Sequence, residues 1–415
     1  MQTHLADFIR DTPEGREAED ILRKCVHCGF CTATCPTYQL LGDELDGPRG
    51  RIYLIKQVLE GQPATEKTRL HLDRCLTCRS CESTCPSGVE YARLADIGRD
   101  VVERQVPRTG VDRLQRAALK ALIPERTLFG SALGLGRLVK PLLPRVIAGK
   151  IPAADGAGRW PAPRHARRMI ALAGCVQPSM RPSINAAAAR VLDRLGISLV
   201  ETVTAGCCGA VRFHLHDQAG GRDDARRNID AWWPAIASGE VEAIVVTASG
   251  CGAHVKEYGH LLKQDPAYAE KAAKVASMSR DIAEVLAAER VRLDPLLAAA
   301  GARTSGGRVA FHSPCSLQHG QRVRGVVESV LAAAGFELAP VRDSHLCCGS
   351  AGTYSLLQPN LATELRDDKL SALQQYGADC IVSANVGCIG HLATAATLPV
   401  RHWIELIDEK VTQSA

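Results

Sequence analysis

The feature that most constrains this chain is a four-cysteine run that occurs twice within its first 100 residues. The copies are Cys25-x2-Cys28-x2-Cys31-x3-Cys35 and Cys75-x2-Cys78-x2-Cys81-x3-Cys85, and a proline follows each directly. Three thiolates at two-residue gaps surround one corner of a cubane cluster, while the fourth cysteine of each run ligates the other cluster. A pair of zinc sites or buried free thiols is the weaker alternative, because zinc ribbons use two separated cysteine pairs.

The two runs therefore predict two 4Fe–4S clusters with crossed ligands. We expect cluster 1 on Cys25, Cys28, Cys31 and Cys85, and cluster 2 on Cys75, Cys78, Cys81 and Cys35. The tight spacing leaves room only for short helices and loops, so residues 1–100 should form a small all-α, ferredoxin-like domain. Gly29 and the run Asp43–Arg49 are expected to be turn and capping elements rather than ligands. Because a cubane accepts one electron with little change in geometry, the pair indicates electron transfer.

Composition excludes several other classes of protein. The chain has 415 residues, of which 46% are hydrophobic and 23% charged, enough for several packed domains and unlike a disordered or collagen-like chain. A net charge of +5 with only 4% aromatic residues argues against nucleic-acid binding. Seventeen cysteines and no apolar leader predict a reducing compartment, so we expect a cytoplasmic protein. The most apolar stretch, 129–149, carries charges and prolines, so no membrane span is expected.

A basic, proline-rich segment follows the cysteine runs at 101–165. Residues 101–170 contain 14 Lys and Arg against 4 Asp and Glu, together with seven prolines. The prolines predict short helices and an extended linker that ends near residue 163. Two alternatives remain open for its cations: a solvated linker, or contact with anionic lipid headgroups or an acidic partner. The residues concerned include Arg137, Lys140, Arg145, Arg164, Arg167 and Arg168.

The rest of the chain alternates strand and helix signals in two rounds, which predicts an internal repeat of two α/β modules at 166–300 and 301–415. In the first module we expect strands at 168–173, 197–203 and 241–247 and a helix at 183–195. In the second we expect strands at 308–311, 336–341 and 380–383 and a helix at 322–334. The fold class is therefore a multidomain α+β chain, with the all-α two-cluster domain followed by the two modules.

Each module carries its own cysteine set, and the spacing fixes the register of the repeat. Cys175 and Cys207, like Cys315 and Cys347, are 32 residues apart, and each later cysteine opens a Cys-Cys-Gly triplet. Ligands gather beyond the carboxyl ends of parallel strands, so each set should converge in space. Each set could bind zinc or a further iron–sulfur cluster, act as redox thiols, or be structural. The sets are Cys175, Cys207, Cys208 and Cys251, and Cys315, Cys347, Cys348 and Cys388.

Other cysteines and histidines near these sets are weaker candidates. Cys380 has no counterpart in the first module and is expected in the core. Ligand, proton-relay and quinone-contact roles are open for the histidines, although a structural role is favoured for each. They are His214, His216 and His254 near the first set, and His312, His319, His345 and His391 near the second.

The segments Cys25–Tyr38 and Gly47–Leu54 closely resemble the iron–sulfur subunit of bacterial glycolate oxidase, also called glycolate dehydrogenase, and the resemblance spans the chain. It implies an electron-transfer subunit without catalytic residues of its own. FAD-containing partner subunits would oxidise glycolate to glyoxylate, and this chain would pass the electrons to quinone or another respiratory acceptor. The implied location is cytoplasmic and peripheral on the inner face of the cell membrane.

The Cys-Cys-Gly (CCG) modules resemble those of the CCG-containing subunit of heterodisulfide reductase, of lactate-utilisation proteins and of anaerobic glycerol-3-phosphate dehydrogenase. Heterodisulfide reductase modules have Cys-x-x-Cys after the triplet, whereas Ala248 and Asn385 occupy the first of those positions here. Each module is therefore one ligand short of a full noncubane cluster. Alternatives remain: the same relay for lactate or glycerol-3-phosphate, a thiol-active disulfide reductase module, or a scaffold whose clusters only hold the fold.

Overall fold

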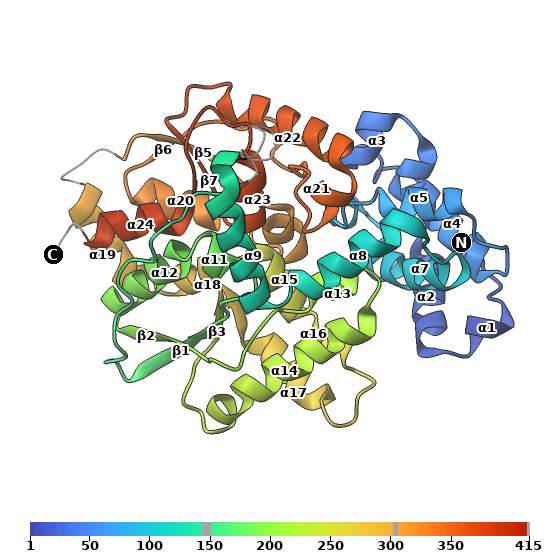
Figure 1. Cartoon of the computed structure of the whole chain (residues 1–415), viewed down its shortest axis with the longest axis horizontal. Helices are drawn as coiled ribbons and strands as arrows, with labels where there is room; N and C mark the ends of the chain where they lie inside the picture. Colours follow the sequence, from blue (N-terminus) through green and yellow to red (C-terminus); the bar gives the residue numbers. More distant parts are fainter. Residues whose placement is uncertain (143–150, 302–305, 413–415) are drawn as a thin grey trace. The chain divides into compact units, whose positions relative to one another are not determined.

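The computed structural model describes residues 1–142, 151–301 and 306–412, and Arg145 of the basic segment falls outside them. The chain divides into two compact units (Figure 1). Unit 1 combines Met1–Ala117 with His345–Lys369, and unit 2 combines Ala118–Ser344 with Leu370–Ala415. All seventeen cysteines lie in the described parts, and none of them is in a disulfide bond. The domain boundaries expected at residues 100, 165 and 300 stay a prediction.

The N-terminal part of unit 1 is all helical. Helix α7 packs against α2, α4 and α5 over a core that includes Leu22, Ile55 and Leu94. Proline occupies the first position of α2, α3 and α4, where its fixed φ suits a helix start. The helices are α1 Asp7–Arg10, α2 Pro13–Lys24, α3 Pro36–Leu41, η1 Glu44–Asp46, α4 Pro48–Leu59, α5 Glu66–Asp73, α6 Ser80–Thr84, α7 Tyr91–Gln105 and α8 Gly110–Leu122.

Unit 1 also contains a segment from far along the chain, His345–Lys369. It carries Cys347 and Cys348, the short helix α21 Tyr354–Leu357 and the first part of α22 Pro359–Gln374. The side chain of Tyr354 is buried, and its hydroxyl donates to the carbonyl oxygen of Arg74 at 3.1 Å. Residues of the second module therefore complete the unit that holds the two cysteine runs.

Unit 2 contains two four-stranded, all-parallel sheets with the same strand order, β2-β1-β3-β4 and β6-β5-β7-β8. This identity of topology confirms the internal repeat. The outer strands β4 and β8 were not predicted, because their sequences, Ser-Arg-Asp and Val-Arg-His, contain no run of apolar residues. The strands are β1 Arg167–Ala171, β2 Ile197–Glu201, β3 Ile244–Val246, β4 Ser279–Asp281, β5 Arg308–His312, β6 Glu337–Leu338, β7 Cys380–Ser383 and β8 Val400–His402.

Helices cover both sheets, and the modules meet within unit 2. Helix α12 packs against α24, and Ser249 at the start of α15 donates its amide to the carbonyl of Ala384 at 3.1 Å. The helices of unit 2 are α9 Arg126–Val139, η2 Lys140–Leu142, α11 Gln177–Met180, α12 Ser183–Arg194, α13 Ala210–His214, α14 Gln218–Ala237, α15 Ser249–Lys256, α16 Tyr258–Leu261, α17 Ala269–Met278, α18 Ile282–Ala288, α19 Arg290–Gly301, the π-turn η3 Ser316–Gly320, α20 Val326–Ala333, α23 Val386–Leu392 and α24 Trp403–Thr412.

The helix expected at 322–334 begins later than predicted, at Val326. Arg322 and Gly325 have φ values of +59° and +72°. A left-handed residue interrupts a right-handed helix, so the chain turns twice before α20 can start. The prediction of a start at Arg322 was therefore wrong by one turn.

The basic residues of the linker have partners nearby. Arg137 donates to the carbonyls of Pro152, Ala153 and Ser179, and Lys140 donates to that of Ile151. The remaining described members form ion pairs: Arg164 with Asp193, Arg167 with Glu242 and Glu289, and Arg168 with Glu240.

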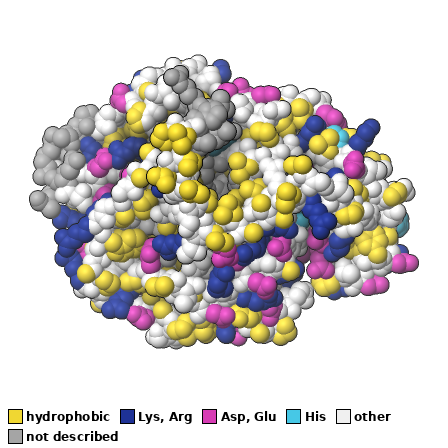
Figure 2. All heavy atoms as spheres, viewed as in Figure 1, with side chains coloured by type: hydrophobic (Ala, Val, Ile, Leu, Met, Phe, Trp, Pro, Cys, Tyr) yellow, Lys and Arg dark blue, Asp and Glu magenta, His cyan; other side chains and the backbone are white. Residues whose placement is uncertain are grey.

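On the face shown in Figure 2, Lys and Arg side chains are interspersed with Asp and Glu. The ion pairs of Arg164, Arg167 and Arg168 favour the paired, solvated linker over an open cationic surface for lipid. Among the described residues, no helix is both long and apolar enough to cross a membrane.

Candidate metal centres

The two cysteine runs fold into loops with the same backbone conformation. His27 and Gly29 have φ values of +56° and +84°, and the equivalent Thr77 and Arg79 have +53° and +60°. Each left-handed non-glycine residue costs about 1–3 kcal/mol and persists only where its surroundings enforce it. The turns curl each loop so that successive cysteines face one space.

The cysteines of the two loops line two cavities, both partly open to solvent. One, of about 440 Å³, has Cys25, Cys28, Cys31, Cys81 and Cys85 in its wall. The other, of about 360 Å³, has Cys35, Cys75, Cys78 and Cys81. Each cavity thus contains one of the crossed quartets that the spacing predicts, and Pro48, Cys81 and Tyr91 line both. We call the spaces cavity 1 and cavity 2; the assignment of ligands within them stays a prediction.

The thiols of both cavities resist ionisation where no positive charge is near. Burial, followed by the charge of Cys25, raises the pKa of Cys31 to about 11. Burial also raises the pKa of Cys81 well above its ordinary value. Four crowded thiolates repel one another unless a cation lies between them, and metal coordination removes a thiol proton outright. The donor set and the cavities therefore fit an iron–sulfur cluster, with all-sulfur ligation.

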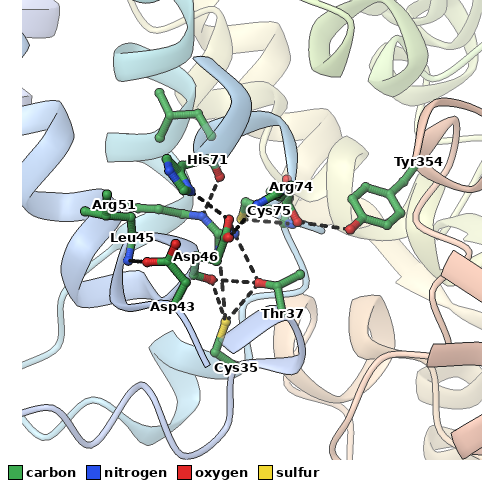
Figure 3. A network of polar contacts seen from close by, with 12 residues as sticks. Cys35, Thr37, Asp43, Leu45, Asp46, Arg51, His71, Arg74, Cys75 and Tyr354 are labelled. Atoms are coloured by element: carbon green, nitrogen blue, oxygen red, sulfur yellow. Dashed lines mark hydrogen bonds and ion pairs between the residues drawn. The ribbon is translucent and has the colours of Figure 1, made fainter. Parts of the chain in front are cut away.

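A buried polar network surrounds cavity 2 (Figure 3). Arg51, 1% exposed, donates Nε to the carbonyl of His71 at 2.7 Å and Nη2 to Oγ1 of Thr37 at 3.1 Å, with Nη1 4.0 Å from Sγ of Cys35. The fully buried carboxylate of Asp46 faces Nη1 of Arg74 at 2.8 Å, Nδ1 of His71 at 3.1 Å and Nη2 of Arg51 at 3.4 Å. Two guanidinium groups thus approach one carboxylate beside the cysteines.

The Asp43–Arg49 run was expected to form turn and capping elements, and this is true of only some of its residues. Asp43 caps η1 by accepting from the amide of Leu45 at 2.9 Å, as expected. Asp46, however, anchors the buried network, a role that a turn interpretation does not include. No sequence motif indicates this role of Asp46, because its partners Arg51 and Arg74 lie in different parts of the chain.

Arg99 of α7 holds the second cysteine loop from the opposite side. It donates to the carbonyls of Leu72 and Cys75, both at 2.8 Å, and to Oγ1 of Thr77 at 2.9 Å. The amide of Thr77 in turn lies 3.4 Å from Sγ of Cys75. Burial alone would raise the pKa of Cys75, but the charges of Arg51 and Arg99 lower it below the ordinary value.

The first module brings its four cysteines together at the carboxyl ends of three neighbouring strands. Cys175 follows β1, Cys207 and Cys208 follow β2, and Cys251 lies in α15 directly after β3. Hydrogen bonds link Cys175 to Cys207, Cys207 to Cys208, and Cys208 to Cys251. The bonds from Cys175 and Cys208 lower the pKa of Cys207, while the same bonds raise the pKa values of the two donors. Within this group, Cys207 is therefore the thiol that loses its proton most readily, and Cys175 and Cys208 keep theirs.

Two side chains fix the backbone of the Cys207-Cys208 pair. Asn228 of α14 donates to the carbonyl of Cys207 at 2.8 Å and accepts from the amide of Gly206 at 2.8 Å. The hydroxyl of Tyr258 accepts from Asn228 at 3.1 Å and donates to the carbonyl of Cys208 at 2.7 Å. Both are fully buried. Neither residue belongs to a sequence motif, so neither was predicted.

The glycine of each CCG triplet has a steric cause. Gly209 and Gly349 have φ values of +95° and +82°. A Cβ at Gly209 would lie 2.5 Å from the carbonyl oxygen of Gly221, and one at Gly349 would lie 2.5 Å from that of Ala362. Only glycine fits where a left-handed turn meets a backbone carbonyl so closely.

The second module distributes its cysteines over both compact units. Cys315 follows β5 and Cys388 lies in α23 after β7, within unit 2, whereas Cys347 and Cys348 belong to unit 1. The convergence of these four stays a prediction. Asn385, which occupies the position of the absent cysteine, caps α23 by accepting from the amides of Gly387 and Cys388 at 2.8 and 3.4 Å.

Two candidate histidines and Cys380 have well-defined surroundings. The buried ring of His254 lies 5.5 Å from the ring of Phe213, and Nδ1 of His312 lies 2.9 Å from Oγ of Ser383. Cys380 is only half-buried, on β7, so it is not the core residue that was expected.

Comparison with known proteins agrees with this architecture. Residues 21–89 match the family model of a 4Fe–4S dicluster domain, and residues 170–256 and 309–393 both match that of a cysteine-rich domain. The chain is 55% identical over 412 residues to the glycolate oxidase iron-sulfur subunit of Escherichia coli K12, covering 99% of both chains. The chain belongs to the glycolate oxidase iron–sulfur subunit family. This confirms the resemblance and the expected fold class.

More distant members show the same relationship. A probable glycolate oxidase iron-sulfur subunit of Bacillus subtilis is 30% identical over 414 residues, which cover 92% of this chain and 90% of that one. A lactate utilization protein A of Geobacillus thermodenitrificans is 27% identical over 220 residues, 52% of this chain and 85% of the relative. The glycolate oxidase subunits therefore match along the chain, whereas the lactate-utilisation proteins match about half of it.

Proposed function

We propose that this chain relays electrons in a flavin-dependent glycolate dehydrogenase complex. Glycolate oxidation to glyoxylate on a flavoprotein partner releases two electrons and two protons, and the electrons enter this chain singly. The observation that carries the proposal is the pair of adjacent cavities, each of which contains one cysteine quartet in its wall. A 4Fe–4S cluster in each supplies a one-electron carrier. Full-length identity to glycolate oxidase subunits favours glycolate over lactate as the substrate of the complex.

The residues of unit 1 fit this relay without a catalytic site. Cys28 is exposed, so the first cavity has an edge at the surface where a donor can approach. Cys81 and Tyr91 line both cavities and form a thin shared wall. The surroundings of the second cavity are fixed by Arg51 and Arg99, which hold its loops through backbone carbonyls. The chain's own part is to position the cysteines and to set the charge around the second cavity.

We propose that Cys175, Cys207, Cys208 and Cys251 of the first module also bind a metal. Four thiols in a hydrogen-bonded chain, fixed by Asn228 and Tyr258, form an all-sulfur donor set. Such a set suits either zinc or a further iron–sulfur cluster. Cys315, Cys347, Cys348 and Cys388 are the corresponding candidates in the second module.

For the remaining steps we propose a quinone or another respiratory acceptor and a cytoplasmic location at the inner face of the membrane. The support is chemical: an electron released by glycolate needs an acceptor, and quinones lie in the membrane. Pairing of Arg164, Arg167 and Arg168 with carboxylates argues for attachment through a partner rather than through this linker.

The test is anaerobic purification of the chain with its flavoprotein, iron, sulfide and zinc quantitation, and EPR after glycolate is added. Reduced-cluster signals with about eight irons per chain support two clusters fed by glycolate. Additional iron supports a third cluster in a CCG module, and zinc supports a structural metal there. Clusters that stay oxidised with glycolate but are reduced by lactate contradict the proposed substrate.

A further inference from the structure

The second cavity combines two features that act in opposite directions on a bound cluster. Three of its cysteines, Cys35, Cys75 and Cys81, are withdrawn from solvent more completely than Cys28 of the first cavity. A reduced cluster with four thiolates is more negative than an oxidised one. Burial therefore opposes its reduction, as burial opposes ionisation of any acid.

The opposing feature is an excess of guanidinium groups. Arg51, Arg74 and Arg99 all lie at the loops of the second cavity, whereas Asp46 is the buried carboxylate that faces two of them. Arg99 directs its donors to two carbonyls and a hydroxyl rather than to a carboxylate. Nη1 of Arg51 lies 4.0 Å from Sγ of Cys35. Positive charge near the ligating sulfurs stabilises the reduced form.

The first cavity has a different charge balance. Arg49 in its wall forms a two-bond pair with Glu44 at 2.6 and 3.0 Å, so its charge is compensated at the surface. The ammonium of Met1 donates to the carbonyl of Cys25 at 2.9 Å and is the cation that remains among the described neighbours.

We propose that Arg51 and Arg99 raise the reduction potential of cluster 2 enough to offset its burial, so that an electron can leave cluster 1 for cluster 2. This deepens the proposed relay function and rests on it. Removal of either charge should lower the potential of cluster 2 and leave that of cluster 1 unchanged. The two arginines are thus positioning residues for electron transfer and take no part in glycolate oxidation.

Tyr354 connects the second cysteine loop to the segment that carries the second module's cysteine pair. Its hydroxyl contacts the carbonyl of Arg74, the residue before Cys75, and its own segment carries Cys347 and Cys348. One buried side chain of unit 1 therefore joins the loop before Cys75 to the segment that carries Cys347 and Cys348.

The experiment is a redox titration of the full chain, followed by EPR with mediators and dithionite. Cys28→Ser and Cys78→Ser assign the two signals, since each alters one cluster. Arg51→Met should shift the midpoint potential of cluster 2 to a more negative value and leave cluster 1 in place. Arg51→Lys, which keeps the charge, should retain most of the wild-type potential. Arg49→Met, at the compensated surface pair, is the matched control and should shift neither.

Arg99→Met provides a second variant in case Arg51→Met binds less iron. Equal shifts of both clusters, no shift in either methionine variant, or the same shift in Arg51→Lys as in Arg51→Met would overturn the proposal. Loss of cluster 2 from both methionine variants and from Arg51→Lys would also overturn it, because the arginines would then act only by holding the ligand loops and not through their charge. The titration uses neither glycolate nor the flavoprotein. It therefore tests the effect of the arginines on the potential independently of whether glycolate is the substrate of the complex.

Discussion

Gly209 and Gly349, which lie 140 positions apart, share a left-handed backbone and the same steric limit: a Cβ at either would lie 2.5 Å from a carbonyl oxygen. The CCG triplet is therefore a structural requirement of the turn as well as a source of thiols. In each triplet the third residue lets the chain reverse against a neighbouring backbone segment, the carbonyl of Gly221 in one case and that of Ala362 in the other.

Gly209→Ala should strongly destabilise the chain, because it adds backbone strain of about 1–3 kcal/mol to a carbonyl clash of similar cost. Gly239 is the matched control, since its φ is +73° but no atom lies within 4 Å of a Cβ there. Gly239→Ala should therefore cost about 1 kcal/mol. Thermal unfolding under anaerobic conditions measures both, and similar losses in the two variants would refute the steric explanation.

Tyr258→Phe should cost about 1–3 kcal/mol, because it leaves the carbonyl of Cys208 buried without its 2.7 Å donor. Tyr268→Phe removes an exposed hydrogen bond to Asp230 and should cost less than about 1 kcal/mol. Denaturant titration of the two variants gives the difference. Equal losses of unfolding free energy in Tyr258→Phe and Tyr268→Phe would show that the hydrogen bond to the Cys208 carbonyl adds nothing special to stability.

Cys28→Ser should remove about four irons per chain and abolish glycolate-dependent acceptor reduction, because Cys28 is a ligand of cluster 1 in the crossed assignment. Cys380→Ser alters a half-buried cysteine outside every quartet and should leave the iron content unchanged. Iron analysis and turnover of the assembled complex provide the comparison. Full turnover in Cys28→Ser would exclude cluster 1 from the relay.

Asp46→Asn should destabilise unit 1 by about 3–5 kcal/mol, since it leaves Arg51 and Arg74 near the second cavity without their buried carboxylate. Asp43→Asn changes an exposed cap three residues away to another good capping residue, so it should cost less than about 0.5 kcal/mol. Unfolding midpoints distinguish the two. A small loss at Asp46 would show that the guanidinium groups are solvated in the folded chain.

The pH dependence of stability should include a contribution from His402. Its Nε2 contacts the carbonyl of Thr247 at 2.9 Å, its Nδ1 accepts from the amide of Ile404 at 3.2 Å, and burial lowers its pKa to about 4. Between pH 4 and the unfolded pKa of about 6.5, the unfolded chain binds more protons, so stability falls as the pH is lowered through this window. The loss is on the order of 3 kcal/mol by pH 4.

His402→Gln should flatten that acid limb, and stability measured for both proteins from pH 7.5 to 5 tests it. Buried Asp281 acts with the opposite sign, because burial raises its pKa to about 6 and the native state then holds the extra proton. Asp281 is present in both the wild type and His402→Gln, so its contribution cancels when the stability of one is subtracted from that of the other. An unchanged difference across the pH range would show that His402 takes up its proton as readily in the folded chain as in the unfolded one.

The sequence predicts the parts of this molecule that depend on spacing. The cysteine runs specify two cavities, and the repeated 32-residue interval specifies two equivalent modules, because ligand geometry and strand order both depend on positions along the chain. The short strands β4 and β8 escape prediction, since tertiary pairing rather than a run of apolar residues defines them.

The residues that support the cysteines could not be predicted in this way. Asn228 reaches Cys207 from another helix, and Tyr354 reaches Arg74 across 280 positions of sequence. Arg51 and Asp46 look like ordinary surface charges until folding buries them. Such contacts depend on packing between distant segments, so no local pattern records them.

The inclusion of His345–Lys369 in unit 1 has a consequence for biosynthesis. The helices around the cysteine runs leave the ribosome first, but the segment with Tyr354 that completes their unit is translated only near the end of the chain. Until then, the loops of the second cavity lack one of their covering elements. We therefore expect iron delivery to the nascent chain to precede closure of the unit, and chains truncated before His345 to load their clusters without protecting them.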